Sequence, residues 1–337
     1  MRTLYGIQYL RAFAAVAVVI FHAAERNGLH FAIGAAGVDV FFVVSGFIMM
    51  AISERRTMRP AAFMRDRLLR IAPSYWIVTG IMIFGALIGL FPNLQLEFWH
   101  VVGSFLFVPV PSPNGGYLWP VLVQGWTLNY EMFFYLLFAA SLFLRPRLRL
   151  PALLAVLGTA VMAGTLQPTG NPQTRFYAEP LVLEFAAGAL FSKLWTRGYV
   201  PPPTVGSALV GMSIAGFAAI HFLKLEFDAL TCGPLAAALV AGVLSIESGG
   251  RLPRMPVANY LGDASYSIYL WHTLAISVAV KAGAVAGMPA LAIAAVGVIA
   301  GILIGVVAYE CVEKPLQSLV KGRLSILWRK QVRRAVP

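Results

Sequence analysis

Residues 7–24, IQYLRAFAAVAVVIFHAA, form an apolar run that contains two ionisable side chains, Arg11 and His22. As an α-helix the run would span roughly 27 Å, close to the hydrocarbon thickness of a bilayer. The residues that follow it, Glu25 and Arg26, do not resemble the small-residue cleavage site of a signal peptide. The run is therefore predicted to be a membrane helix.

Apolar runs of similar length recur along the 337-residue chain, of which 59% is apolar and 12% charged. An average soluble domain carries about a quarter charged residues, so this chain is expected to be solvated by lipid. The expected membrane helices lie at residues 7–24, 35–52, 71–91, 121–144, 151–167, 180–196, 204–222, 229–246, 259–280 and 288–310. The sequence thus predicts an all-α polytopic membrane protein with about ten transmembrane helices.

Charge bias sets the expected topology. The apolar stretch at residues 98–108 is too short to cross and is bracketed by prolines, so we assign it as a re-entrant or interfacial segment. With ten crossings and cytoplasmic N- and C-termini, 22 of the 26 Lys and Arg side chains lie on the cytoplasmic side, as the positive-inside rule requires. The net charge of +12 is therefore attributed to topology and to contact with membrane lipids, without a nucleic-acid partner.

The chain is expected to have one membrane domain, residues 1–316, and a basic cytoplasmic tail, residues 317–337. No soluble catalytic domain is expected, so any chemistry would take place within the membrane body or its loops. The two cysteines, Cys232 and Cys311, lack metal-ligand spacing, and no metal site is predicted.

Ionisable side chains inside membrane helices are costly, so each is a candidate functional residue. Arg11 and His22 are eleven residues apart and would share one helix face, about 16 Å apart along the axis. Four more ionisable residues would lie at the depth of His22, between the midplane and the outer leaflet: Asp39, Glu131, Glu184 and His272. The alternative for each residue taken singly is a packing contact, with Arg11 reaching headgroups and His22 bonded to a carbonyl. Their shared depth favours function.

Six arginines lie within residues 55–70, a segment predicted to be a cytoplasmic loop. Topology alone explains some of them. Arg67 and Arg70 are spaced i to i+3 at the start of the next predicted helix, so they would share one face. Paired guanidinium groups bind phosphates in bidentate fashion, which makes this pair a candidate phosphate site.

Several short motifs, taken together and in order, resemble the membrane acyltransferase-3 family. They are Arg11 and His22, GVDVFFVVSGF at residues 37–47, RLLRIAP at 67–73, WTLNYE at 126–131, LGDASYSIYLWH at 261–272 and EKP at 313–315. The resemblance runs to about residue 316, and within the family the chain looks most like exopolysaccharide and nodulation-factor O-acetyltransferases. The family's Trp-Ser-Leu appears here as Trp126-Thr127-Leu128, and Glu131 is in place.

The resemblance implies a membrane-bound O-acyltransferase, multi-pass in the bacterial inner membrane. It would move an acetyl or other short acyl group from cytoplasmic acyl-CoA to a hydroxyl of an extracytoplasmic or lipid-linked glycan such as an exopolysaccharide. The co-substrate is expected to be acetyl-CoA or another short-chain acyl-CoA. The expected cofactor-binding residues are Arg11, Arg67, Arg70 and Tyr75, and the expected substrate-binding residues are Ser45, Trp126, Tyr130 and His272.

Acyl transfer to a hydroxyl needs a general base, and a neutral imidazole near pH 7 can accept the proton, so His22 is assigned this role. Glu131 or Asp39 would orient the ring and stabilise its charged form, as a carboxylate does in the serine hydrolase triad. Glu131 is the deeper of the two acids, but the sequence does not decide between them. A covalent acyl intermediate on Ser45 or His22 is a second route that the sequence leaves open.

Two other functions compete with acyl transfer. A proton-coupled transporter or flippase of lipid-linked sugars would use the buried His and carboxylates as a proton relay. That reading does not explain the arginine pair at residues 67 and 70. A non-enzymatic membrane scaffold, in which every polar residue is structural, does not explain why so many ionisable positions share one depth.

Overall fold

The computed structural model describes residues 4–55, 58–166 and 171–319, and the regular structure within them is all helical. The α-helices are α1 (Tyr5–Glu25), α2 (Gly37–Arg55), α3 (Pro60–Leu87), α4 (Phe98–Leu106), α5 (Trp126–Ser141), α6 (Pro146–Leu166), α7 (Pro172–Tyr177), α8 (Val182–Thr196), α9 (Pro203–Leu223), α10 (Ala229–Ser248), α11 (Pro256–Val285) and α12 (Ala290–Ala308). Two 3₁₀-helices, η1 (Ala32–Ala36) and η2 (Val123–Gly125), and one π-helix, η3 (Tyr309–Glu313), complete them. The prediction of an all-α protein is confirmed. The basic residues of the predicted tail from position 321 onward lie outside the described residues.

Eight helical segments of the described chain are long and apolar enough to cross a membrane. They are α1, η1 with α2, α3, α6, α9, α10, α11, and α12 with the residues up to Leu319. The predicted spans at 121–144 and 180–196 correspond to α5 and α8, whose 16 and 15 residues would reach only about 24 and 22 Å. A total of ten crossings, and the side on which the termini lie, stay predictions. The stretch at 98–108 forms α4, a nine-residue helix too short to cross.

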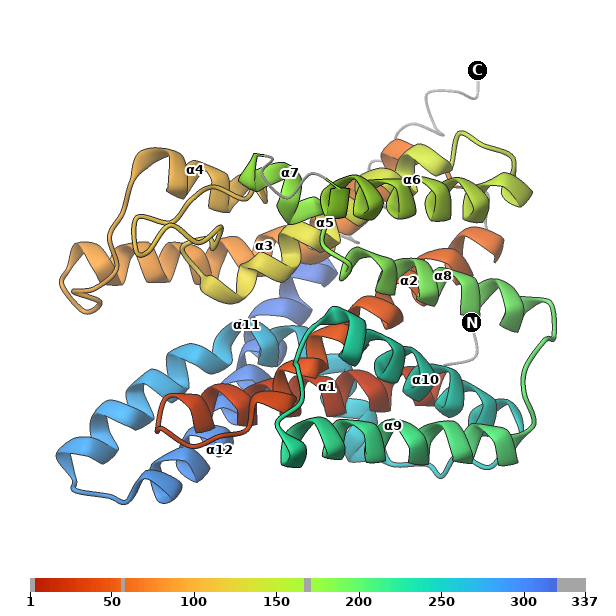
Figure 1. Ribbon diagram of the computed structural model, residues 1–337. Helices are drawn as coiled ribbons and strands as arrows, with labels where there is room; N and C mark the ends of the chain where they lie inside the picture. The colour runs from red at the N-terminus through yellow and green to blue at the C-terminus, as the bar shows by residue number, and fades with distance from the viewer. Residues whose placement is uncertain (1–3, 56–57, 167–170, 320–337) are drawn as a thin grey trace.

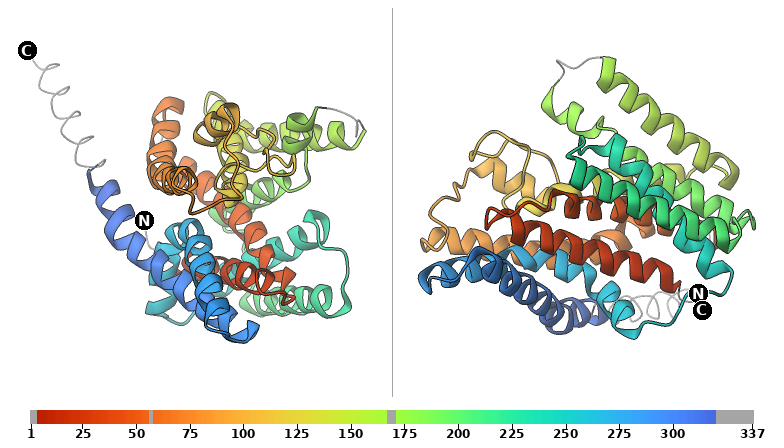
Figure 2. Two further views of the ribbon diagram at one scale, coloured as in Figure 1. Left: turned by 90° about the vertical axis from the view of Figure 1, so that its left-hand side faces the viewer. Right: turned by 60° about the horizontal axis from the view of Figure 1, so that its bottom comes forward.

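Helix α2 lies in the interior of the bundle. It packs against α1, α8 and α10, while α11 packs against α1 and α12 (Figures 1 and 2). Figure 1 shows α3, α4, α6 and α7 on one side of α2 and α8, and α1, α9 and α10 on the other. The sequence of α2, GVDVFFVVSGF over residues 37–47, is apolar around most of the helix, which is the pattern of a helix buried on all sides by other helices.

Two glycines let α2 and α8 approach backbone to backbone. A Cβ on Gly46 would overlap the carbonyl oxygen of Phe185, and one on Gly188 would overlap the carbonyl oxygen of Val43. Small residues at such crossings permit close helix packing in membranes. The short helix α8 is therefore held against the central helix by contact that no larger residue allows.

Gly188→Ala is expected to push α8 away from α2 and to lower the free energy of unfolding by about 2–3 kcal/mol, as overpacking does elsewhere. The measurement is thermal unfolding of the purified protein in detergent. Gly158→Ala in α6 is the matched control, because nothing lies within 4 Å of the added Cβ. Equal stability of the two variants would contradict the close α2–α8 contact.

The arginines of residues 60–70 belong to a helix, so the predicted loop over this segment was wrong. Helix α3 begins at Pro60, where the missing N–H of proline costs no helical hydrogen bond. Phe63 is almost completely buried and anchors this first turn in the core. The arginines after it therefore project from a rigid helix, with Arg67 and Arg70 three residues apart on one face.

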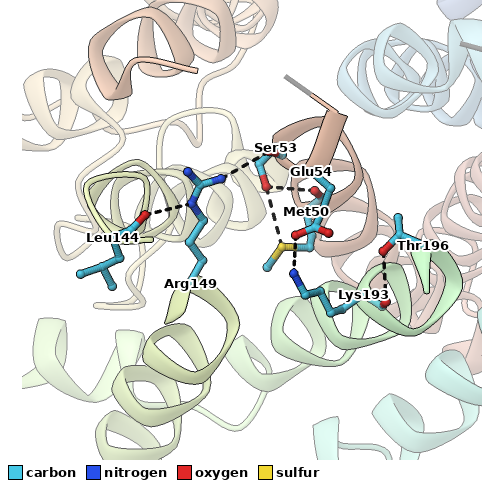
Figure 3. A network of polar contacts seen from close by, with 7 residues as sticks. All are labelled: Met50, Ser53, Glu54, Leu144, Arg149, Lys193 and Thr196. Carbon is cyan, nitrogen blue, oxygen red and sulfur yellow. Dashed lines mark hydrogen bonds and ion pairs between the residues drawn. The ribbon is translucent and has the colours of Figure 1, made fainter. Parts of the chain in front are cut away.

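Arg149 and Lys193 tie α6 and α8 to the end of α2 (Figure 3). The Arg149 guanidinium donates to the carbonyl oxygen of Ser53 at 3.3 Å and to that of Leu144 at 3.4 Å. The Lys193 ammonium lies 2.5 Å from the Glu54 carboxylate. Arg149 precedes the predicted span at residues 151–167, but α6 begins at Pro146 and buries it. Its charge therefore also serves to join helices.

Candidate active site

A cavity of about 230 Å³ lies between α1, α2, α3, α5 and α11, and we call it the arginine cavity. Arg11 of α1 and Arg67 and Arg70 of α3 line it, together with Glu131 of α5. The predicted face shared by the two α3 arginines is thus directed at a cavity. Three guanidinium groups around one space offer many N–H donors in fork geometry, which suits a ligand with phosphate groups.

Arg70 is held by a carboxylate on the opposite wall of the bundle. Its Nη1 lies 2.8 Å from Oε1 of Glu313, whose side chain is only 1% exposed. Glu313 also accepts hydrogen bonds from Ser267 Oγ at 2.6 Å and Gln317 Nε2 at 2.8 Å. Glu313 closes the π-helix η3, a local irregularity of a kind often found at functional sites. These contacts fix the direction of the Arg70 guanidinium.

Arg11 and Arg67 differ in their contacts. Arg11 Nη1 donates to Gln8 Oε1 at 3.1 Å, and Gln8 Nε2 donates in turn to Asp263 Oδ1 at 2.9 Å. Arg67 forms no ion pair within the described part of the chain, and its buried Nε has no hydrogen-bond partner there. An arginine with an unused donor beside a cavity is able to bind an anion.

Glu313→Gln is expected to lower the free energy of unfolding by about 1–3 kcal/mol, because it removes a buried charge that accepts three hydrogen bonds. Thermal unfolding in detergent measures the change. Glu310→Gln is the matched control on the same π-helix, since Glu310 is exposed and contacts Lys314 and Tyr260 at the surface. It is expected to unfold at the wild-type temperature, and equal losses in the two variants would refute the structural role of Glu313.

Glu131 contacts side chains of the arginine cavity. It accepts a hydrogen bond from Ser45 Oγ at 3.2 Å and another from the Tyr135 hydroxyl. Ser45 and Tyr135 line the same cavity. The structure therefore brings together two predicted site residues, Ser45 and Glu131, and places them with the arginines and away from His22.

A second cavity, of about 170 Å³, contains His22, and we call it the histidine cavity. Its lining includes four side chains from different elements that can contact a sugar: His22 of α1, Asp39 of α2, Trp126 of α5 and Asp228, which caps α10. Three of the four were predicted site residues. Two residues, Val38 and Tyr269, line both this cavity and the arginine cavity.

His22 lies beside the second predicted histidine. The ring centroids of His22 and His272 are 5.2 Å apart. His272 is fully buried, and its Nδ1 lies 3.1 Å from the carbonyl oxygen of Ile268. A carbonyl only accepts, so the proton is on Nδ1 and the lone pair on Nε2, which has no partner within the described residues. This unpaired acceptor belongs to the ring that lies beside His22.

The carboxylate found next to the His22 ring is neither Glu131 nor Asp39. Nδ1 of His22 lies 3.5 Å from Oε2 of Glu25, one turn along α1. Asp39 shares the cavity with His22 and interacts with Glu184, which is also buried. The residues of the predicted layer thus form two pairs, His22 with His272 and Asp39 with Glu184. His22 and Asp39 line one cavity, whereas Glu131 lines the other.

Three predicted site residues line neither cavity: His272, which lies beside His22, and the tyrosines Tyr75 and Tyr130. Tyr75 is fully buried, and its ring centroid lies 5.0 Å from that of Phe107, with the two rings tilted. Tyr130 is buried with its ring 4.0 Å from that of Phe176. Both side chains belong to the hydrophobic core. The structure thus shows packing contacts for them, and cofactor binding by Tyr75 and substrate binding by Tyr130 stay predictions.

Four residues at or behind the cavity walls received no role from the sequence: Gln8, Tyr135, Tyr269 and Glu313. Glu313 and Tyr269 stand inside motifs already noted, EKP and LGDASYSIYLWH, and Tyr269 precedes His272 by three residues on one helix face. Their positions in those motifs were the signal from which the sequence could have indicated Glu313 and Tyr269 as site residues. In the described part of the chain, no three His, Cys, Asp or Glu side chains are arranged to hold a metal ion.

Comparison with known proteins gives a family match over most of the chain. The profile of the third acyltransferase family, described as an acyltransferase domain, matches residues 4–310. The exopolysaccharide production protein ExoZ of Rhizobium meliloti (strain 1021) is 53% identical over 305 residues, which cover 90% of this chain and 96% of ExoZ. Nodulation protein 10 of Rhizobium leguminosarum bv. viciae is 28% identical, over 94% of this chain and 95% of that protein. The peptidoglycan O-acetyltransferase OatA of Listeria monocytogenes is 24% identical, over 79% of this chain and 48% of OatA. No solved structure matches the chain.

Proposed function

This chain belongs to the acyltransferase-3 family of membrane acyltransferases, and we propose that it transfers a short acyl group from acyl-CoA to a hydroxyl of a surface polysaccharide. The observation that carries the proposal is the pairing of an arginine cavity with a separate histidine cavity. The names of its relatives, which refer to exopolysaccharide production and to O-acetyl transfer onto peptidoglycan, support a polysaccharide acceptor.

The arginine cavity is the proposed donor site. CoA carries several phosphates, and Arg11, Arg67 and Arg70 supply the guanidinium groups to bind them. These residues lie in the N-terminal halves of α1 and α3, and the charge bias assigns the N-terminal end of each helix to the cytoplasm. Acetyl-CoA from the cytoplasm of a bacterial cell, entering at the inner membrane, is the proposed donor.

The histidine cavity is the proposed site of acyl transfer. His22 accepts the proton of the sugar hydroxyl while the hydroxyl oxygen attacks the thioester carbonyl carbon. The carbon–sulfur bond breaks, and His22 returns the proton to the sulfur, so the products are an O-acyl sugar and free CoA. Asp39, Asp228 and Trp126 line the same cavity and offer a sugar hydrogen-bond acceptors and an aromatic surface. A lipid-linked oligosaccharide or a polymer chain is the proposed acceptor.

The contact between Ser45 and Glu131 supports a two-step variant of the same function. A carboxylate 3.2 Å from a hydroxyl can accept its proton, and Ser45 Oγ would then attack the thioester carbonyl. The carbon–sulfur bond breaks and CoA leaves with that proton, and the sugar hydroxyl then displaces Ser45 from the acyl group, returning a proton to Ser45 Oγ. Acyl label bound to protein after incubation with radiolabelled acetyl-CoA, lost in Ser45→Ala, would establish this route. Absence of such label in the wild-type protein would establish direct transfer.

One assay tests the proposed function against transport of lipid-linked sugars. The protein in proteoliposomes is given radiolabelled acetyl-CoA and the deacylated surface polysaccharide of the source organism. Free thiol is then measured together with label on the polysaccharide. We expect both to appear in equal amounts. Movement of lipid-linked sugar across the bilayer without release of CoA would overturn the proposal in favour of a transporter.

A further inference from the structure

The two cavities meet at a wall formed by Val38 and Tyr269. Val38 belongs to the first turn of α2 and Tyr269 to the middle of α11, and each lines both cavities. Every other residue of either lining belongs to one cavity only. Because Val38 and Tyr269 are the residues that both linings share, the route we consider for an acyl group, from a donor bound by the arginines to His22, runs between these two side chains.

Tyr269 is fixed in this wall. Its hydroxyl donates to the carbonyl oxygen of Gln124 at 3.0 Å and shares a second hydrogen bond with Thr127 Oγ1 at 2.9 Å. Its ring packs edge-on against Phe41, with centroids 6.0 Å apart. Swinging the ring aside would break two buried hydrogen bonds, which is costly in a membrane interior. The Tyr269 ring is therefore expected to stay in place and to limit the width of an acyl group that moves from the arginine cavity to the histidine cavity.

Val38 forms the other side of the passage. It is 8% exposed and belongs to the hydrophobic core, although its side chain faces both cavities. Valine is branched at Cβ and rigid about its first side-chain bond, so its methyl groups cannot rotate freely out of the way. The passage is thus bordered by one pinned aromatic ring and one stiff aliphatic side chain.

The shape of the donor determines what this passage can select. The part of the pantetheine arm next to the sulfur, made of the cysteamine and β-alanine units, is an unbranched chain, and a straight acyl group is no wider than this part of the arm. A branched acyl group is wider at its second carbon. We propose that Val38 and Tyr269 form a filter that admits straight short acyl groups to His22 and excludes branched ones. This inference rests on the proposed function.

Butyryl-CoA and isobutyryl-CoA test the filter because they have the same atoms and differ only in branching. The acceptor is the deacylated surface polysaccharide, and the measured quantity is kcat/KM for each donor by release of free thiol. The wild-type protein should prefer butyryl-CoA. Val38→Ala should raise the relative use of isobutyryl-CoA about tenfold or more, as removal of methyl-sized obstacles does in other substrate pockets. Tyr269→Phe, which keeps the ring and removes its hydrogen bonds, should change the preference in the same direction.

Two further Val→Ala variants serve as matched controls. Val44 lines only the arginine cavity and Val18 only the histidine cavity. Both Val44→Ala and Val18→Ala should keep the wild-type ratio between the donors. The ratio is independent of the fraction of folded protein, because both donors are assayed on one preparation.

Three outcomes would overturn the filter: equal use of the two donors by the wild-type protein, an unchanged ratio in Val38→Ala and Tyr269→Phe, or an equal change in the control variants. If the wild-type protein uses neither butyryl-CoA nor isobutyryl-CoA, activity of Val38→Ala with either donor would support the filter. Inactivity of Val38→Ala with both donors would refute it. Failure of the wild-type protein to consume acetyl-CoA refutes the proposed function itself, so the two failures are distinguishable.

Discussion

His22→Ala is expected to reduce acyl transfer by at least about 10²–10⁴-fold, the usual contribution of a general base. His22 is the imidazole that lines the second cavity, and its ring lies 5.2 Å from that of His272. His22 is the one imidazole among the described residues that line this cavity, so removal of its ring removes the assigned base. The measurement is release of CoA from acetyl-CoA in the presence of polysaccharide acceptor, with protein content and membrane insertion checked in parallel.

His30→Ala is the matched control for this experiment. His30 lies in the connection between α1 and η1, is exposed, and stacks at 5.5 Å on His221. It lines neither cavity, so its loss should leave transfer near the wild-type rate. A His22→Ala protein that is folded, inserted and still active at that rate would refute the assignment of His22 as the base.

The helices of this protein were largely predictable because lipid imposes a simple requirement. A segment that crosses must be apolar for about twenty residues, and such runs are visible in a single sequence. The starts of helices were less predictable. Helix α3 begins at Pro60, in a segment whose arginines suggested a loop, because burial of Phe63 stabilises a turn that looks polar in sequence.

The candidate site was predictable along each helix but not between helices. Spacing alone placed Arg67 and Arg70 on one face, and the structure directs that face at a cavity. Counting residues along a helix gives the depth of a side chain in the membrane, but it does not show which side chains of other helices lie next to it. Glu131 and His22 were therefore expected to meet, whereas they line different cavities. Helix α5 also begins at Trp126, later than predicted, which alters the depth of Glu131.

Long-range pairing explains what the sequence could not supply. The partner of Arg70 is Glu313, near the other end of the described chain, and no local pattern links the two. The same holds for Tyr269 and Thr127, which are joined by a hydrogen bond between α11 and α5. The sequence thus indicated which residue types carry the chemistry, and the packing of distant helices determines how they are combined.

Arg67→Ala and Arg70→Ala are each expected to weaken binding of CoA about 10- to 100-fold, because a hydrogen bond to a charged group contributes about 1.5–3 kcal/mol. Arg65→Ala is the matched control, since Arg65 lies on the same helix, is half exposed and pairs with the adjacent Asp66. Titration of the purified protein with CoA in detergent gives the three dissociation constants.

The two arginines should differ in a second measurement, which separates binding from folding. Arg70→Ala leaves the buried Glu313 without its ionic partner, so this variant should also unfold at a lower temperature. Arg67 forms no ion pair among the described residues, so Arg67→Ala should lose CoA binding with little loss of stability. The difference in CoA affinity between the wild-type protein and Arg67→Ala should also decrease as the salt concentration is raised, because the contact is electrostatic. An unchanged dissociation constant in a stable Arg67→Ala protein would rule out a phosphate contact at this residue, and with it the arrangement in which α3 directs both of its arginines at the donor.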